Sequence, residues 1–497
     1  VFTIVVTVAA AACVVGPKYQ PETVVSPAQR IGVTRGSDSS RAFFDSIAVT
    51  SRAGDTVASL AGGASIFVRA PSVERKRFSD DSLASIAWLD IVRDTTLVRL
   101  VNVALRQNRN LQIATARINE YRAAVGAAKA PQLPSVTLNG SESANQIALG
   151  SFPPTSYKAA RITGDLAWEL DFWGRVRRGV DAANADLGSQ EAAERATVLS
   201  LISDVASGYL QLLELDQERV IAEQTLSSRT STLEIARDRY NQGLTSELDV
   251  RQFEAQVAAP AVTLAQTQRS IAVAEHNLDV LLGQTPMQIA RGGSLVAAAE
   301  GLIVPDSISV AVIARRPDLQ QAERAYAAAT ARVGMADAAR LPTISIVGSY
   351  GSQAGEPQNI FGNQTRVYQA LAGISFPLFD NGRLASASAA ARARAEQARA
   401  AYEGTALNAL REANDALSGV RTARDQAVAQ LTQANALRHV LELATLRYQS
   451  GLSSYLDLLD AQRSLFSAEL ALSQAQLGEL LAAVQLYKAL GGTWTAR

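Results

Sequence analysis

Few residues in this 497-residue chain have side chains that could carry out chemistry. There are two histidines, His276 and His439, and a single cysteine, Cys13, which is too few for a metal cluster or a histidine-based catalytic centre. No nucleophile is paired with a base and no phosphate-binding loop is present, so we expect no catalytic residue, no metal site and no cofactor. The 47 basic residues balance 47 acidic residues, and this zero net charge gives no indication of nucleic-acid binding.

The best candidates for chemistry are acidic residues in and beside two nearly identical segments. RYNQGLTSELDV spans residues 239–250, and RYQSGLSSYLDL spans residues 447–458. Asp460 stands where the first copy has Gln252, and Leu456 lies four residues before it on the same helix face. If this face points towards the axis of a symmetric trimer, three Asp460 carboxylates form a ring that repels, shares a proton or holds a cation. The alternative is a solvated aspartate on an ordinary helix.

Each segment is also typical of a turn between two helices. A glycine at a left-handed position ends the first helix, and a serine or threonine caps the second. An aspartate then lies near the helix N-terminus, where the helix dipole favours a carboxylate. The glycines are Gly243 and Gly451, the caps are Ser246 and Ser454 or their neighbours Thr245 and Ser453, and the aspartates are Asp249 and Asp457. A capped helical hairpin by itself therefore explains both aspartates.

The two segments belong to a duplication that covers most of the chain. They are separated by 208 residues (447 − 239), and so are other matching landmarks, such as Gly174 and Gly382 (382 − 174). A constant offset means that one structural unit has been duplicated with almost no net insertion. We divide the chain into a first repeat at 87–294 and a second repeat at 295–497.

Each repeat is expected to contain a very long helix followed by a shorter one. Residues 175–240 and 383–448 contain no proline and are rich in residues that favour helices. Helices of this length do not fit inside a globular domain and indicate an extended bundle. The shorter helices are expected at 246–283 and 454–490. A further helix opens each repeat, and in the first repeat it is predicted over 97–128.

Two strand hairpins are expected, at 134–172 and 342–379. In residues 161–172 apolar and polar side chains alternate, which places them on opposite faces of a sheet. This pattern is typical of a membrane barrel, but also of a soluble sandwich. The acidic residues that would face the lumen of a barrel are Asp165, Glu169 and Asp171.

Four strands per chain cannot close a membrane barrel, because the smallest such barrels have about 8 strands. Three copies would supply 12 strands, whereas two would leave a narrow lumen filled with side chains. A trimer is therefore the better interpretation if the strands cross a membrane.

The N-terminus is typical of an exported protein. Residues 1–12 are almost wholly apolar and end in small residues directly before Cys13, as at the end of a signal peptide that precedes a lipid-modified cysteine. A cysteine inside a cleaved signal peptide is the alternative. The chain begins with Val1 and has no basic residue ahead of the apolar run, which fits a truncated start. Residues 13–86 are expected to form a lipidated N-terminus and an extended connector. No later stretch has 18 consecutive apolar residues, so no transmembrane helix is expected.

Five motifs together resemble the TolC-like outer-membrane efflux family, and most closely its OprM/NodT branch of lipoproteins. The motifs are CVVGPKY at 13–19, APQLP at 130–134, DFWGR at 171–175, RRPDL at 315–319 and LLDAQR at 458–463. No single motif suffices, but in this order and on a duplicated chain they form a specific signature. The resemblance covers residues 10–24 and 85–493.

This resemblance implies a mainly α fold with a membrane β-barrel part, namely a TolC-like α/β-barrel with two internal repeats and four strands per chain. A homotrimer would form a 12-stranded barrel in the outer membrane, anchored by lipid at Cys13, and a long α-helical barrel in the periplasm. Such a channel is the non-enzymatic, passive exit duct of a tripartite pump for drugs or other small toxic compounds. Its implied partners are a periplasmic adaptor and an inner-membrane transporter of the RND type. The alternative is a coiled-coil-like structural lipoprotein without a pore.

The resemblance also assigns roles to the two repeated segments, which would form the periplasmic tip where an adaptor docks and the pore closes. The residues implied for docking are Arg239, Tyr240, Gly243, Leu244, Ser246, Arg447, Gly451, Leu452 and Ser454. The residues implied for the periplasmic gate are Tyr448, Leu456, Asp457 and Asp460. Leu456 and Asp460 would form an apolar and an acidic ring, and Tyr448 would help to hold the inner hairpin shut.

Overall fold

The computed structural model describes residues 15–17, 19, 30–31, 94–148, 150, 153–300 and 308–492. The predicted signal peptide at 1–12, Cys13 and most of the predicted connector lie outside the described residues. The chain folds into two compact units. One consists of Val1–Val24, Gln107–Ser200 and Ala314–Ala409, and the other of Val25–Arg106, Leu201–Ile313 and Leu410–Arg497. Each unit combines parts of both sequence repeats, because each of the two longest helices begins in the first unit and ends in the second.

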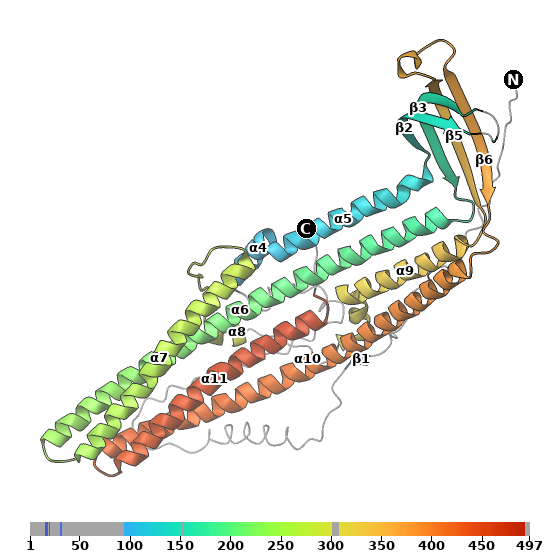
Figure 1. The fold of residues 1–497 in the computed structure, drawn as a ribbon. Coiled ribbons are helices and arrows are strands. Elements are labelled where there is room, and N and C mark those ends of the chain that lie inside the picture. The colour runs from blue at the N-terminus through green and yellow to red at the C-terminus, as the bar shows by residue number, and fades with distance from the viewer. Residues whose placement is uncertain are drawn as a thin grey trace. The chain divides into compact units, whose positions relative to one another are not determined.

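The first unit carries a four-stranded antiparallel sheet (Figure 1). Its strands are β2 (Ser135–Ile147), β3 (Thr155–Leu170), β5 (Thr343–Ala354) and β6 (Arg366–Ser375). The order is β2-β3-β5-β6, so both predicted hairpins are present and β3 of the first repeat pairs with β5 of the second. The central strand pair therefore joins the two repeats within one sheet.

Over residues 135–138, 163–170, 343–346 and 372–375, apolar and polar side chains lie on opposite faces of this sheet, in register from strand to strand. Cross-strand partners on the apolar face include Val136 and Leu166, Trp168 and Ile346, and Ile344 and Ile374. Partners on the polar face include Thr137 and Asp165, Glu169 and Ser345, and Thr343 and Ser375. Val136, Leu138 and Ile374 are 72%, 79% and 74% exposed. The alternation predicted along single strands thus extends across this part of the sheet, and its apolar face is open in the isolated chain. Farther along the strands the pattern is mixed, because Val347 pairs with Leu371 on the polar face.

The helix predicted over 97–128 is wrong in one respect, because the structure divides it into α4 (Thr95–Gln107) and α5 (Arg109–Lys129). Asn108 between them has a ψ of 129°, which lies outside the helical region. Its side-chain oxygen accepts a hydrogen bond from the Leu111 N–H at 3.0 Å. Asparagine is a favoured N-cap, so this residue ends one helix and starts the next. The apolar periodicity continues across the break and conceals it in the sequence.

The other helices have the lengths that the sequence predicts. α6 (Arg175–Asn241) and α10 (Arg383–Gln449) contain 67 residues each. α7 (Glu247–Leu282) follows α6, and α11 (Tyr455–Ala489) follows α10. α9 (Pro317–Ala338) is the helix that precedes the sheet strands of the second repeat. Figure 1 draws α6 in green and α10 in orange, so the continuity of each helix can be followed.

The second unit has a core of large apolar side chains from several helices. Its smaller elements are α8 (Leu295–Glu300) and a short strand pair formed by β1 (Arg30–Ile31) and β4 (Ile308–Ser309). Fully buried members of the core include Leu97, Tyr209, Leu210, Leu278, Leu295 and Leu480. These residues hold α4, α6, α7, α8 and α11 together by burial of apolar surface.

Within the described part of the chain, one helix is long and apolar enough to cross a membrane by length and composition alone. This helix is α6, and half of its most apolar 18-residue stretch is buried inside the protein. The expectation of no transmembrane helix rested on unbroken apolar runs and did not consider such a stretch. Core helices pass the same test, so this observation is weak evidence for a membrane span.

Candidate functional site

The two repeated segments form turns of the same geometry in the second unit. Gly243 has a φ of 73° and Gly451 a φ of 74°, the left-handed conformation that glycine adopts without steric cost. In the first turn, the Gly243 N–H donates to the Tyr240 carbonyl at 2.9 Å and the Leu244 N–H donates to the Arg239 carbonyl at 2.9 Å. Gly451 and Leu452 make the same two bonds at 3.0 and 2.8 Å. Both helices therefore end in a Schellman motif, which satisfies their last carbonyls.

Reciprocal caps start the helices that follow these turns. The Ser246 hydroxyl accepts from the Asp249 N–H at 3.2 Å, and the Asp249 carboxylate accepts from the Ser246 N–H at 3.2 Å. The Thr245 hydroxyl also donates to Asp249 at 2.6 Å, and this bond is the main reason why the pKa of Asp249 is lowered. In the second copy, Asp457 accepts from the Ser454 N–H at 3.3 Å within the same kind of capping box. Capping thus accounts for Asp457, which the sequence analysis also placed in the gate.

Behind the turns, the two hairpins share an apolar cluster that we name the tip core. Its buried members are Leu233, Ala236, Val250, Phe253, Tyr448, Tyr455 and Leu458. The ring centroids of Phe253 and Tyr455 are 4.2 Å apart in an edge-to-face arrangement, and those of Phe253 and Tyr448 are 6.3 Å apart. Tyr448 is 7% exposed, whereas its repeat partner Tyr240 is 44% exposed. The hairpins are therefore alike in their turns but not in how they contribute to the core.

Leu456 and Asp460 lie on the exposed face of α11, opposite the buried Leu458. Leu456 is 61% exposed, and three further leucines of the turns are similarly open, namely Leu244, Leu248 and Leu452. A single chain thus presents one leucine and one aspartate on a common helix face, available to other copies. The apolar and acidic rings that this face would form in a trimer remain a prediction.

Four residues of this region were given no role from the sequence, although the difference between Tyr455 and Glu247 is visible there, and all four differ from their repeat partners. Phe253, Tyr455, Arg229 and Gln462 correspond, at an offset of 208, to Ala461, Glu247, Leu437 and Glu254. All four are buried in the second unit. Mismatches between the copies are therefore the signal that could have identified them.

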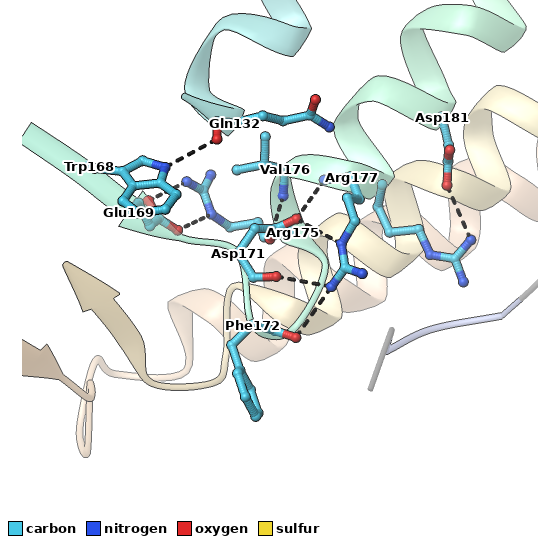
Figure 2. Close-up of polar contacts among 10 residues, drawn as sticks. Gln132, Trp168, Glu169, Asp171, Phe172, Arg175, Val176, Arg177 and Asp181 are labelled. Atoms are coloured by element: carbon cyan, nitrogen blue, oxygen red, sulfur yellow. Dashed lines mark hydrogen bonds and ion pairs between the residues drawn. The ribbon is translucent and has the colours of Figure 1, made fainter. Parts of the chain in front are cut away.

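A second polar site lies where β3 passes into α6 (Figure 2). Asp171 Oδ1 accepts from the Val176 N–H at 2.9 Å, and Oδ2 accepts from the Arg177 N–H at 2.8 Å. Glu169 pairs with Arg175 through bonds of 3.0 and 2.7 Å. The prediction that Asp171 faces a barrel lumen is therefore wrong, because Asp171 follows the last residue of β3 and caps the first turn of α6. Both oxygens of this carboxylate accept hydrogen bonds from backbone N–H groups of α6, so the side chain is turned towards the helix and not towards a pore.

The other two predicted lumen residues do lie on the sheet. Asp165 and Glu169 occupy the polar face of β3. Asn139 of β2 donates to Asp165 at 2.6 Å, and the indole N–H of Trp168, on the opposite face, donates to the Gln132 carbonyl at 3.1 Å. Acidic and amide groups therefore line one face of the sheet while aromatic and aliphatic groups cover the other.

The described N-terminal residues pack against this junction within the first unit. The Val15 N–H donates to the Trp173 carbonyl at 3.2 Å, and Arg178 Nη2 donates to the Gly16 carbonyl at 3.3 Å. A side chain at Gly16, which has a φ of 99°, would meet the backbone of Gly334 at 2.4 Å. The close approach of two backbones requires glycine here and fixes the path of the N-terminal segment.

One buried acid lies apart from both sites. Glu214 of α6 is buried, and burial together with the nearby Glu218 raises its pKa to about 7. Gln474 of α11 donates to Glu218 at 3.4 Å, so the pair faces that helix. Among the described residues there is no group of three or more His, Cys, Asp or Glu side chains that could hold a metal ion.

Comparison with known proteins identifies a single family. The model of the family described as outer membrane efflux protein matches residues 100–284 and again 308–492, so its two matches repeat the offset of 208 (308 − 100). The probable efflux pump outer membrane protein TtgC of Pseudomonas putida is 34% identical over 435 residues, which cover 85% of this chain and 88% of that protein. The cation efflux system protein CusC of Escherichia coli O157:H7 is 28% identical over 418 residues, covering 83% and 90%.

The fold is also that of a solved channel. The structure of the open state of the MtrE outer membrane channel of Neisseria gonorrhoeae superimposes with a TM-score of 0.74 at 29% identity. The match covers 85% of this chain and 96% of that one, so it includes the sheet and the long helices together.

Proposed function

The chain belongs to the outer membrane efflux protein family, and we propose that three copies of it assemble into one exit duct. The family consists of outer-membrane efflux channels of tripartite pumps, which are transport ducts and not enzymes. This chain is accordingly a component of the outer membrane that extends into the periplasm. Family membership argues against the alternative of a coiled-coil-like lipoprotein without a pore.

The structure of the sheet is the main support for the proposed trimer. The sheet has four strands, one apolar face and one polar face, and it is too small to close on itself in a membrane. In the proposed trimer, 12 strands close into a barrel with the apolar face towards lipid and with Asp165 and Glu169 towards water. Closure also pairs the backbone groups at the edges of β2 and β6, which hydrocarbon would otherwise leave without partners.

We propose that the periplasmic end of this duct closes at the tip of α11. Leu456 and Asp460 share an exposed helix face, and three copies of this face around an axis make an apolar ring next to an acidic ring. Tyr448, near the end of α10, contributes from within the tip core, where its ring packs against Phe253. The exposed face closes the pore and the buried face holds the hairpin in place.

The docking surface for a periplasmic adaptor is proposed at the two turns. Both turns are closed by two backbone hydrogen bonds, and exposed leucines lie beside them, at 244 and 248 in the first hairpin and at 452 in the second. Exposed apolar residues beside such turns suit the helical hairpin of a partner protein. The inner-membrane partner is proposed to be a transporter of the RND type, and the cargo to be drugs or other small toxic compounds. The polar face of the sheet gives such cargo a wet path without a tight binding site.

We propose that a lipid is attached to Cys13, and the position of Val15, two residues later, supports this. Val15 is bound to Trp173 at the junction of β3 and α6. Two residues of extended chain reach about 7 Å at most, so a lipid on Cys13 would lie close to the membrane end of the first unit. Labelling with radioactive palmitate tests this proposal, and the Cys13→Ser variant is the control that must lose the label.

The duct itself is tested by purifying the protein in detergent and inserting it into a planar bilayer. We expect a trimer that dissociates only on heating and ion conductance that appears in discrete steps. A monomer that conducts no ions would contradict the proposed function and favour the structural lipoprotein.

A further inference from the structure

Arg229 is a buried cation at the contact between α11 and the first hairpin. It lies on α6, ten residues before Arg239, and is 3% exposed. Its guanidinium donates to the Gln256 carbonyl of α7 at 2.9 Å and to the Gln462 carbonyl of α11 at 3.4 Å. It also lies 5.3 Å from the ring centre of Phe466 on α11. One side chain of the first repeat thus reaches both the helix that follows it and the helix that carries the proposed gate.

No carboxylate of the described residues compensates this charge. Among the described residues, no acidic group lies within ion-pair distance of Arg229, and burial and the nearby Arg463 both lower its pKa. Three buried polar atoms of this contact have no hydrogen-bond partner in the described structure, namely Arg229 Nε, Tyr455 Oη and Gln462 Oε1. Burial of a charge without a counterion, beside polar groups without partners, opposes the packing that surrounds it.

The two copies differ in the residue that stands beside this contact. Gln462 corresponds to Glu254 of the first repeat, where the carboxylate binds Arg237 at 2.8 Å and Arg251 at 2.9 Å. Position 462 has a glutamine in place of this glutamate, so the side chain there is a neutral amide, although the buried Arg229 is close by. The contact of Arg229 with α11 therefore lacks the kind of ion pair that Glu254 makes within the first hairpin.

We propose that Arg229 keeps the contact of α11 with α6 and α7 reversible, acting as a positioning residue for the gate. While the hairpins are packed, its charge is buried with incomplete hydrogen bonding. When the gate end of α11 moves away, the guanidinium, Tyr455 and Gln462 become hydrated together, which offsets part of the apolar contact that is lost. This inference rests on the proposed gate, because it explains how the helix that carries Leu456 and Asp460 is able to separate.

The test measures hydrogen–deuterium exchange of the backbone amides of residues 455–466 in the purified trimer. We expect Arg229→Met, which keeps the length of the side chain and removes the charge, to slow exchange about tenfold, as replacement of buried charge by apolar groups commonly stabilises a contact. Gln462→Glu should also slow exchange, because it supplies the missing carboxylate. In the double variant the carboxylate is buried alone, so exchange should be faster than in either single variant.

Arg237→Met is the matched control. Arg237 lies on the same helix with its side chain 53% exposed, and its ion pair with Glu254 is at the surface. Surface pairs contribute little, so exchange of residues 455–466 should stay within about twofold of the wild type. Exchange in Arg229→Met that is unchanged or faster than in the wild type would overturn the proposal. Arg229 would then either have no effect on the contact between α11 and its neighbours or stabilise it.

The exchange experiment does not depend on conduction. A wild-type protein that conducts no ions would refute the duct, while the exchange rates would still decide whether Arg229 weakens the contact. If both proposals hold, Arg229→Met also lowers the fraction of time that the channel spends open in a bilayer.

Discussion

The guanidinium carbon of Arg239 lies 5.1 Å from the ring centre of Tyr448, and Arg239 Nη1 donates to the Tyr448 carbonyl at 3.3 Å. The arginine belongs to the first copy of the repeated segment and the tyrosine to the second. Both segments begin with an arginine and a tyrosine. The contact joins the arginine of one copy to the tyrosine of the other, and not the two residues of the same copy. This contact connects the last turn of α6 to the last turn of α10.

Replacing Arg239 should loosen that connection. Arg239→Leu removes a cation–π contact of about 0.5–2 kcal/mol and one charge-assisted hydrogen bond, so the closed hairpin should be less stable. We expect a higher single-channel conductance in a bilayer. The control is Arg447→Leu, since Arg447 is the exposed repeat partner. Equal effects of the two substitutions would show that the contact with Tyr448 does not hold the hairpin.

Asp460 tests the proposed acidic ring. Asp460→Ala removes three carboxylates from the narrowest part of the proposed trimer, and we expect the conductance of the purified channel to rise. Gln252→Ala changes the corresponding position of the first hairpin and should leave conductance as it is. Unchanged conductance in Asp460→Ala would remove Asp460 from the gate.

The two turn glycines should be sensitive to any side chain. A left-handed conformation costs an L-residue about 1–2 kcal/mol, so Gly243→Ala and Gly451→Ala should each lower the free energy of unfolding by that amount. Gly404 lies inside α10 with open space around its Cα, and Gly404→Ala should raise stability by about 0.5–1 kcal/mol. Denaturant unfolding of the purified protein measures all three. The same sign for all three substitutions would contradict the role of the backbone conformation.

Glu214 should make stability depend on pH. Burial and Glu218 raise its pKa from near 4.5 to about 7 in the folded protein. The folded state therefore binds a proton more tightly than the unfolded state, and this contribution to stability is complete below about pH 4.5 and is lost as the pH rises through about 7. We expect the melting temperature to fall between pH 5.5 and 8, and Glu214→Gln to flatten that slope.

A surface carboxylate provides the comparison for Glu214. Glu223 of the same helix has a side chain 44% exposed and pairs with Arg219. Glu223→Gln should keep the pH dependence of the wild type. The assignment to Glu214 fails if Glu214→Gln retains the full slope.

The elements that sequence predicts well here are those set by local composition and periodicity. The helix predicted at 175–240 is α6, at Arg175–Asn241, because its residues favour helix wherever it packs. The strands are recognised by their alternation, and the turns at Gly243 and Gly451 by glycine followed by a capping residue. Each of these patterns can be recognised from a few neighbouring residues, without knowledge of contacts between distant segments.

The rest depends on contacts between distant segments or on a single residue. Arg229 appears in the sequence as one of many helical arginines, and only the packing of α7 and α11 against it makes it a buried charge. Asn108 interrupts a helix whose apolar pattern continues unchanged. Asp171 continues the alternation of β3, but the strand ends one residue earlier and the carboxylate binds helix N–H groups instead. At Asp171 the alternation typical of a strand and the preference of aspartate for a helix N-terminus predict different structures, and the residue caps the helix.

The pairing of β3 with β5 also constrains how the chain reaches its fold. The paired residues Ala160 and Ala354 are separated by 194 residues (354 − 160), and Leu170 and Ile344 by 174 (344 − 170). Pairing over such distances forms slowly, because the entropy of closing a long loop is lost before any contact is gained. Whenever β2 and β3 are paired before β5 has joined them, the β3 edge is open to other chains. The β3–β5 pair thus closes the two edges at which a half-folded sheet is most open to association with other chains.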